Sequence, residues 1–433
     1  MKFLDDLTSE DSDFAYNAAK EQYGLFTSFS CLYPNFQGTR NRILNSALFI
    51  IFSTLVITNS IALCLTLYLS LDDATVAMQT IHFIVMNLIA YTILFTFNYR
   101  RKNISRMHHL LGENQQFYDD DTIKSIDDFR LDLKKKTKIF NIALPVFISV
   151  TGMQVICLNP IVDYFSGELG KNIYSKNGVS MNLAIPCWTP FGSNNTFTFL
   201  LSMTLQAGDH FVIVSSIVTG NMILFSMSRQ IISELTLLIS AIKRLQERIK
   251  FKYLQLYGRP FNCNLNNKIT DKRYHYCYSL CLKENIKHHQ RIISLLRDMN
   301  ITWEWSFFIF FCTSTFSMAM CGILLMFGDG KVTTNINAIT MGVIEVFDVF
   351  FVCWCGKMMK DLGEELYLHL YETNWIDSTK ESARTLLIIM SVSKKPLSLY
   401  FNSITRLPAN LETFSNLMNT AYSYFNLLYA FIF

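Results

Sequence analysis

Seven long apolar stretches divide the chain. A window of about 20 residues, the length that crosses a bilayer as a helix, places them at Ile43–Leu71, Ala74–Asn98, Ile139–Val162, Thr196–Met227, Trp303–Phe327, Asn337–Gly356 and Leu411–Phe433. The last stretch is the least hydropathic, but it has no charged residue after Glu412. The pattern therefore predicts an all-α membrane protein with seven transmembrane helices. Trp303 and Trp305 open the fifth stretch, where an interfacial aromatic belt is expected.

The basic residues predict how these helices are oriented. Of the 38 Lys and Arg residues, 35 lie before the first stretch or in the segments that follow the second, fourth and sixth. Because positive charge is retained in the cytoplasm, the N-terminus is predicted inside and the C-terminus outside. The predicted organisation is a cytoplasmic segment (1–42), helices 1 to 4 (43–227), a cytoplasmic anchor region (228–302), helices 5 and 6 (303–356), a second anchor region (357–410) and helix 7 (411–433).

Composition and charge narrow the class of protein. Hydrophobic residues make up 51% of the chain and charged residues 17%, whereas a soluble domain has about a quarter of its residues charged. A net charge of +4 is too small to indicate a nucleic-acid partner. The chain lacks a Gly-rich phosphate loop, paired metal ligands and a nucleophile motif, so we expect no catalytic residue, cofactor or metal. We expect membrane lipid to surround the apolar stretches.

Two other classes of membrane protein are considered. A G-protein-coupled receptor has an external N-terminus, the opposite of the orientation predicted here, so no G protein is expected. A secondary transporter would also carry polar residues within its spans, but transporters often contain inverted repeats. We see no repeat, and the number of spans is odd. The transporter remains the alternative that the residues alone leave open.

Helical patterns continue beyond the membrane on the cytoplasmic side. After the fourth stretch, apolar residues recur on one stripe, which must be buried against something. Either one chain buries it in its own helical hairpin, or several subunits share a bundle. The adjacent pairs His108-His109 and His288-His289 are expected to be solvated or interfacial. The stripe consists of Ile232, Leu235, Ile239, Ile242, Leu245 and Ile249.

The seventh stretch carries a polar stripe. Asn416, Asn419, Thr420, Ser423 and Asn426 share one helical face. Polar side chains in hydrocarbon usually face a partner helix or water. They would either bond to other helices of one bundle or line an aqueous path, and the second interpretation needs several subunits around an axis. The face continues outward through Leu427, Ala430 and Phe431, which could gate such a path by dewetting.

Three short motifs follow one another in the last eighty residues. "CWCGKMMKDLGEELYLHLYETNW" has a Tyr-x3-Trp spacing at Tyr371 and Trp375. "LLIIMSVSKKPLSL" contains Met390 and Pro396, and the chain continues into "AYSYFNLL". In the order and spacing of these motifs the chain resembles the insect odorant receptor family, whose ending "AYSYFNLL" matches with Ala421 in place of Ser. Gustatory receptors share the topology but end in Thr-Tyr-x4-Gln-Phe, so a gustatory-like channel is a weaker alternative.

The resemblance implies a ligand-gated, non-selective cation channel. Its subunits would form a heterotetramer in which this odour-tuned chain assembles with the odorant receptor co-receptor, at the plasma membrane of olfactory neuron dendrites. The cytoplasmic helices would form the inter-subunit anchor. A pore lined by the seventh helix would place Asn416, Thr420, Ser423, Leu427, Ala430 and Phe431 on the ion path.

The resemblance also implies an odorant site within each subunit, in the outer half of helices 2 to 6. Direction and helical face select the candidates, and His82 could donate a hydrogen bond to an odorant oxygen. Gly152 is expected to leave room for a small volatile molecule. The predicted ligand residues are Met78, Ile81, His82, Ser149, Gly152, Met153, Ile156, Met203, Ala207, Thr340 and Ile344.

Other polar features are assigned less directly. His82, Asp209, His210, Glu345 and Asp348 are ionisable residues within predicted spans, and such residues are functional hypotheses by default. Glu345 and Asp348 lie one turn apart and could meet the seventh helix near the ion path. Asp209 is expected to hold helices together. Asn194 begins a glycosylation sequon on the predicted outer face.

Overall fold

The computed structural model describes residues 38–112, 117–165, 178–181, 183–191, 196–261, 271–327, 332–373, 375, 378–395, 397–401 and 407–432. The sequon at Asn194 lies outside these residues. The helices are α3 (Gly38–Leu69), α4 (Ala74–Tyr99), α5 (Arg101–Gly112), α6 (Asp120–Lys124), α7 (Asp127–Phe165), α8 (Thr196–Lys243), α9 (Leu245–Tyr257), α11 (Lys272–Phe327), α12 (Val332–Tyr371), α13 (Lys380–Ser393) and α14 (Leu411–Ile432).

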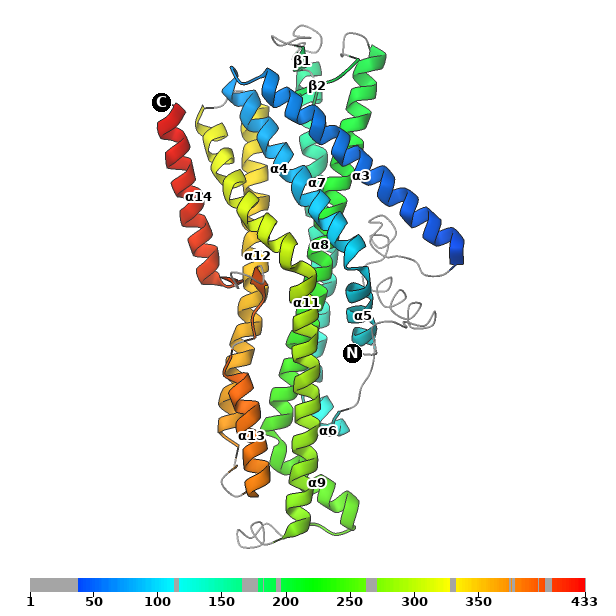
Figure 1. The fold of residues 1–433 in the computed structure, drawn as a ribbon, viewed down its shortest axis with the longest axis vertical. Helices are drawn as coiled ribbons and strands as arrows, with labels where there is room; N and C mark the ends of the chain where they lie inside the picture. The colour runs from blue at the N-terminus through cyan, green and yellow to red at the C-terminus, as the bar shows by residue number, and fades with distance from the viewer. Residues whose placement is uncertain are drawn as a thin grey trace.

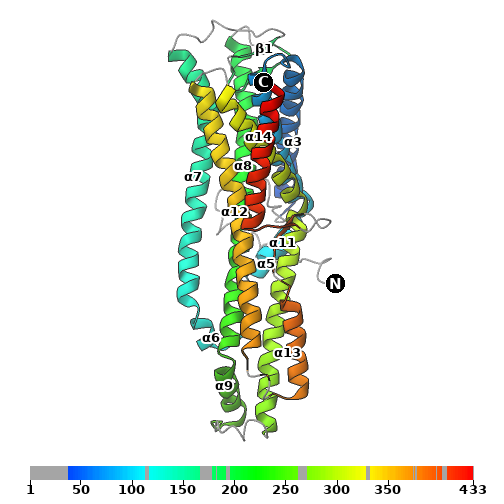
Figure 2. The same cartoon turned by 90° about the vertical axis from the view of Figure 1, so that its left-hand side faces the viewer.

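Three very long helices form the axis of the molecule. α8, α11 and α12 have 48, 56 and 40 residues and lie side by side along its length (Figures 1 and 2). α3, α4 and the upper part of α7 join them at one end, while α6, α9 and α13 surround them at the other. At 1.5 Å per residue α11 is about 84 Å long, so it extends well beyond a bilayer.

Each predicted span coincides with one helix, although the first runs two residues beyond the end of α3 and the last residue of the seventh, Phe433, is not described. Several helices run further than the spans. α7 begins at Asp127 and α11 at Lys272, both far ahead of the apolar stretches that they contain. Among the described residues, six helices are long and apolar enough to cross a membrane: α3, α4, α7, α8, α11 and α12. α14 is not among the six, because its polar stripe lowers its hydropathy.

Short paired strands lie at two places. β1 (Val179–Ser180) pairs antiparallel with β2 (Cys187–Trp188) at the predicted outer end, with Ser180 opposite Cys187. The Trp188 amide donates to Thr66 of α3 at 2.7 Å, and the Gln206 amide of α8 donates to the Ile185 carbonyl at 2.8 Å. This segment is thereby tied across the end of the bundle. β3 (Tyr400–Phe401) pairs antiparallel with β4 (Leu407–Pro408), ahead of α14.

The apolar stripe that continues from the fourth span is buried inside this chain. All six of its residues, from Ile232 to Ile249, belong to the largest apolar core, together with residues of α11, α12 and α13. The intramolecular packing interpretation therefore accounts for this stripe. α9, which carries its last residues, ends at Gly258, whose φ of +66° is the left-handed conformation that glycine adopts readily at a helix C-terminus.

A buried polar cluster lies beside this core. The Arg248 side chain is 3% exposed; it donates to Glu284 at 2.7 Å and to Asn285 at 2.8 Å, and lies 4.4 Å over the Tyr118 ring. His288, expected to be solvated or interfacial, is fully buried, and its Nε2 lies 2.6 Å from Glu234. His108 and His289 are also buried, so none of these three histidines is solvated. Helix-to-helix packing outside the membrane encloses them.

Candidate ligand pockets and pore helix

A pocket in the predicted outer half of the bundle contains His82. It encloses about 400 Å³ of atom-free space, part of which is open to solvent. α4, α11 and α12 supply most of its wall, and Ala184 closes it from the segment between β1 and β2. The residues that line it are Gln79, His82, Phe83, Ala184, Cys321, Leu324, Thr334, Asn337, Ala338 and Met341.

The His82 ring has one nitrogen bonded and one unbonded. Its Nδ1 lies 2.7 Å from the Ser317 hydroxyl, which fixes the ring orientation. Its Nε2 is buried and has no hydrogen-bond partner among the described residues. Unpartnered buried polar atoms are uncommon in folded proteins. An oxygen-bearing molecule in this pocket would satisfy this nitrogen.

Of the predicted ligand residues, only His82 lines this pocket, and several others pack near it. Met78 and Ile81 pack in a small apolar cluster with Ala338 and Leu324, two residues of the pocket wall. Thr340 accepts a hydrogen bond from Gln154 of α7 at 3.0 Å. Ile344 lies in a different pocket, described below. Ile156 and Met203 pack in a cluster of side chains from α4, α7 and α8 that also contains Met341.

Four further predicted ligand residues, three on α7 and Ala207 on α8, lie away from the outer pocket. Gly152 leaves no room for a ligand, because a Cβ built there would lie 2.7 Å from Val214 of α8 and 3.3 Å from the His210 ring. Its absent side chain allows α7 and α8 to approach closely. Met153 is 64% exposed on the outside of the bundle, and Ala207 is also exposed, while Ser149 is half-buried. None of these four residues lines the outer pocket.

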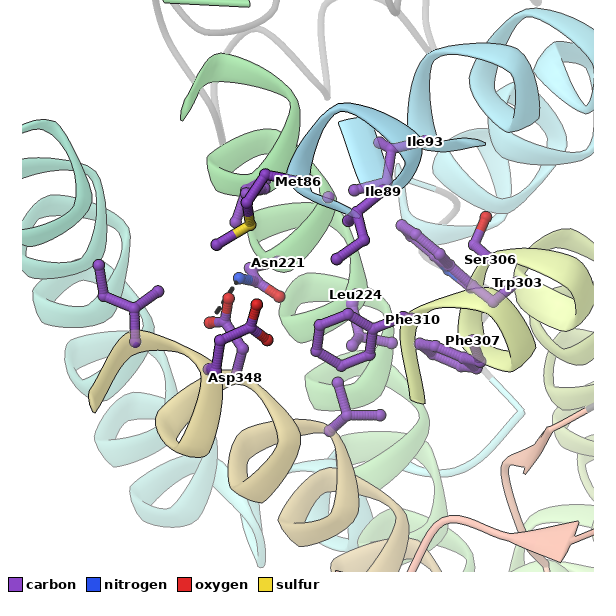
Figure 3. A pocket seen from close by; sticks show the side chains of 15 residues that line it. Met86, Ile89, Ile93, Asn221, Leu224, Trp303, Ser306, Phe307, Phe310 and Asp348 are labelled. Carbon is purple, nitrogen blue, oxygen red and sulfur yellow. Dashed lines mark hydrogen bonds between the residues drawn. The ribbon is translucent and has the colours of Figure 1, made fainter. Parts of the chain in front are cut away.

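A second pocket lies deeper in the bundle, at the level of Trp303 (Figure 3). It holds about 590 Å³ of atom-free space and is formed by α4, α8, α11 and α12. One wall carries Trp303, Phe307 and Phe310 of α11, with the Trp303 and Phe307 rings stacked at 5.6 Å. Trp303 is 3% exposed and thus faces the bundle interior, whereas Trp305 is 53% exposed.

Two carboxyl groups line the opposite wall of this inner pocket. Asp348 accepts a hydrogen bond from the Asn221 amide at 3.0 Å. Glu345, one turn earlier on α12, is 2% exposed, and its Oε1 has no hydrogen-bond partner among the described residues. Both residues line a pocket between α8 and α11. The structure places these two residues in contact with α8, α11 and this pocket, and nothing among the described residues supports a place for them beside the predicted ion path.

α14 packs on the rest of the chain by one face only. Phe414, Leu417, Ala421, Phe425 and Leu428 are buried or half-buried against α11 and α12. Gly322 of α11 allows this approach, because a Cβ there would lie 3.1 Å from the Phe425 ring. At 100° per residue these positions centre on one side of the helix.

The polar stripe lies on the opposite side of α14. Asn416, Asn419, Thr420, Ser423 and Asn426 are all exposed in the subunit. The Thr420 hydroxyl donates to the Asn416 carbonyl at 2.8 Å, and that of Ser423 donates to the Asn419 carbonyl at 2.9 Å, so both bonds stay within the helix. The single-bundle interpretation of the stripe is therefore wrong for these two hydroxyls. Leu427 is 53% exposed and Ala430 is exposed on the same face, while the Phe431 side chain lies outside the described part of the chain.

Several pocket residues were not found from the sequence. Ser317, Cys321 and Asn337 surround His82, and Asn221 and Phe310 line the inner pocket. They lie on helices far apart in the chain, and each is an ordinary residue within an apolar run. The sequence offered one signal that could have identified some of them, namely a polar residue within a span, such as Asn221 or Ser317.

Comparison with known proteins agrees with this architecture. Odorant receptor 19a of Drosophila melanogaster is 26% identical over 144 residues, which are 33% of this chain and 36% of that receptor. Odorant receptor 10 of Aedes albopictus is 24% identical over 144 residues, 33% of this chain and 37% of that receptor. The chain thus spans about a third of the length of the curated relatives that it matches.

Similarity in fold extends much further. The solved structure of the insect olfactory receptor OR5 from Machilis hrabei, in complex with eugenol, superposes with a TM-score of 0.75 at 14% identity. The match covers 97% of this chain and 99% of that one. The family described as "7tm Odorant receptor" matches residues 73–422, most of the sequence. This multi-pass membrane protein, built of long α-helices, therefore belongs to the odorant receptor family, a family of receptors and not of enzymes.

Proposed function

We propose that the chain is the odour-tuned subunit of a ligand-gated, non-selective cation channel. The observation that carries this proposal is the exposed polar face of α14, which lies opposite the face that packs on α11 and α12. Inside a membrane such a face requires water or another polar surface. Copies of α14 arranged around an axis would supply both, and would enclose an aqueous path between subunits.

The predicted pore residues follow from this face. Asn416, Thr420 and Ser423 would line the wider part of the path, and their neutral side chains suit passage of cations without strong selection among them. Leu427 and Ala430 would form the apolar constriction toward the predicted outer end, with Phe431 beside them. Dewetting of this constriction would close the channel, and displacement of α14 would open it.

The odorant would bind in the outer pocket. Its wall is mostly apolar, and the unbonded Nε2 of His82 and the side chains of Gln79 and Asn337 supply a few polar contacts. A small volatile molecule with one or two oxygens, such as an alcohol, phenol or ester, fits this combination. OR5 of Machilis hrabei was solved with eugenol, a small phenol, which supports the same class of ligand for this chain.

The route from this pocket to the pore is short. Leu324 lines the pocket and belongs to the apolar cluster that packs against Phe425 and Leu428 of α14. Movement of α11 or α12 around a bound odorant would therefore be transmitted to α14. By resemblance to its family, the chain would assemble with the odorant receptor co-receptor in a heterotetramer at the plasma membrane of olfactory neuron dendrites.

The first test is whole-cell current in cells that express this chain with and without the co-receptor, during a panel of small volatile alcohols, phenols and esters. Odour-evoked cation current that requires both chains is expected. His82→Phe should raise the concentration for half-maximal response about five- to tenfold, the equivalent of one lost hydrogen bond. His210→Phe is the matched control, because His210 is buried in the same bundle but does not line the pocket. Equal shifts in both variants would refute the site.

The pore is tested separately by thiol accessibility. Ser423→Cys should become sensitive to a charged thiol reagent during odour application, with progressive loss of current. Leu417→Cys is the control, because Leu417 faces the rest of the chain. The unsubstituted chain is treated in parallel, since it has its own exposed thiols at Cys64 and Cys312. Equal reactivity at positions 423 and 417 would contradict a pore along the polar face.

A further inference from the structure

The inner pocket has features that the odorant proposal does not use. It lies one level below the outer pocket, at Met86 to Ile93 of α4 instead of Gln79 to Phe83. Its wall combines three aromatic rings with two carboxyl groups and one amide. None of the described residues that line the outer pocket carries a carboxyl group. The two pockets are therefore suited to different ligands.

The carboxyl groups lack a cationic partner. No ion pair joins Glu345 or Asp348 to a Lys, Arg or His side chain among the described residues, although both are buried, at 2% and 4% exposed. The hydroxyls of Ser314 and Ser317 lie beside Glu345, but Glu345 Oε1 has no donor in bonding geometry. Asp348 receives the Asn221 amide. Buried carboxyl groups are normally paired with a cation or a set of donors, so this wall has unused capacity to accept.

The aromatic wall faces the same space. Trp303 and Phe307 stack with their planes 17° apart, and Phe310 lines the pocket next to them (Figure 3). Aromatic faces attract a cation that is at least partly stripped of water. Among the described residues no group of three His, Cys, Asp or Glu side chains is placed to hold a metal ion. Two carboxyl groups and one amide fall short of the six to eight oxygens that Ca²⁺ takes.

We propose that the inner pocket is a second ligand site, which binds a hydrophobic organic cation such as an arylalkylamine. The ammonium group would lie between Glu345 and Asp348, which supply acceptors, while Asn221 holds Asp348 in place. The apolar body of the ligand would lie against Trp303 and Phe310. A primary amine is protonated at neutral pH, as the lysine side chain is, and its three N–H donors match the unpartnered oxygen and its neighbour.

This proposal does not depend on conduction, so its test uses binding. The full chain is expressed with the co-receptor, and membranes are incubated with radiolabelled phenethylamine. Saturable binding is expected, and unlabelled 2-phenylethanol, a neutral molecule of similar shape, should fail to compete at equal concentration. Loss of a buried charged partner costs about 2 kcal/mol or more, so Glu345→Gln and Asp348→Asn should raise Kd at least about 30-fold.

Two further variants keep the test decisive. Glu345→Asp retains the charge and should bind at least tenfold more tightly than Glu345→Gln, which a merely structural role of Glu345 would not produce. Asp209→Asn is the matched control: Asp209 is equally buried but bonded to Asn59 at 2.5 Å, outside this pocket. It should leave Kd unchanged. Absence of saturable binding, equal competition by 2-phenylethanol, or equal Kd for Glu345→Gln and the parent chain would each overturn the proposal. Odour-evoked current is measured in the same cells, so failure here is separable from failure of the channel proposal.

Discussion

Gly356 of α12 packs directly against the backbone that precedes α14. A Cβ built at Gly356 would lie 2.0 Å from the Ala409 carbonyl oxygen and 3.0 Å from its carbon, so the two backbones are in direct contact. Ala409 is held in turn by its amide, which donates to the Leu399 carbonyl at 2.8 Å. Asn410 then caps α14 by accepting from the Thr413 amide at 2.8 Å. Any side chain at position 356 must therefore displace the backbone from which α14 starts.

Gly356→Ala is predicted to destabilise the protein. Replacing glycine by alanine within a helix gains about 1 kcal/mol, but overpacking costs about 1–3 kcal/mol. The upper end applies, because the obstacle is backbone and the oxygen must move about 1 Å before reaching even the shortest contacts that Cβ atoms make. The expected net loss is about 2 kcal/mol in the free energy of unfolding.

Gly342→Ala is the matched control on the same helix. A Cβ there would meet only the Cys321 Cβ, at 3.6 Å, an ordinary contact. This variant should therefore gain up to about 1 kcal/mol from helix propensity. Thermal unfolding of the purified full-length protein in detergent measures both, and the expected order of melting temperature is Gly342→Ala, then the parent chain, then Gly356→Ala. Equal stability of the two variants would refute the reasoning, because it would mean that the Ala409 backbone yields at no cost.

Three further predictions concern the region outside the membrane. Burial lowers the pKa of His108 from 6.5 to about 4, so the stability that depends on its neutral ring is present above pH 6.5 and is lost as the pH falls toward 4. Between pH 7.5 and 5.5 the unfolding free energy of the parent chain should fall by about 1.4 kcal/mol more than that of His108→Gln. Parallel curves of melting temperature against pH for the two proteins would contradict this. Arg248→Met leaves Glu284 and the Tyr118 ring without their buried guanidinium partner and should lower the unfolding free energy by about 3 kcal/mol. An unchanged melting temperature would show that this polar cluster does not contribute to stability. Gly258→Ala places a side chain at a φ of +66° and should cost about 1 kcal/mol, and Gly258→Asn, which tolerates this conformation better, should cost less.

The course of the helices could be predicted from hydropathy, because a bilayer imposes one requirement on every span. The same holds for the stripe from Ile232 to Ile249, which has a clear 3.6-residue period and is buried. The polar stripe of α14 was also readable, since one helix carries all of it. The exposure of this face in the subunit could not be predicted, because it depends on how α14 packs against α11 and α12.

The pockets could be predicted only in part, because each is built from several helices. His82 was found, since an ionisable residue in a span is conspicuous. Gly152 was misread, because a glycine in a helix creates either space or close approach, and only the neighbouring Val214 shows which. Met153 was placed inward by depth alone, but depth does not fix rotation about the helix axis, and its side chain points outward. Trp303 occupies an interfacial position in the sequence but turns into the bundle.

The hydroxyl groups on α14 determine what that face presents to its surroundings. The protons of Thr420 and Ser423 are directed at carbonyls one turn back in the same helix. Their oxygen lone pairs are therefore what remains outward. At these two positions the face offers the negative ends of dipoles without fixed charge, while the amides of Asn416, Asn419 and Asn426 beside them offer both donors and acceptors. If this face lines the proposed pore, cations would meet hydroxyl oxygens at Thr420 and Ser423, and the carboxyl group of Glu412, exposed on the same face where α14 begins, would add a negative charge near one end of the path.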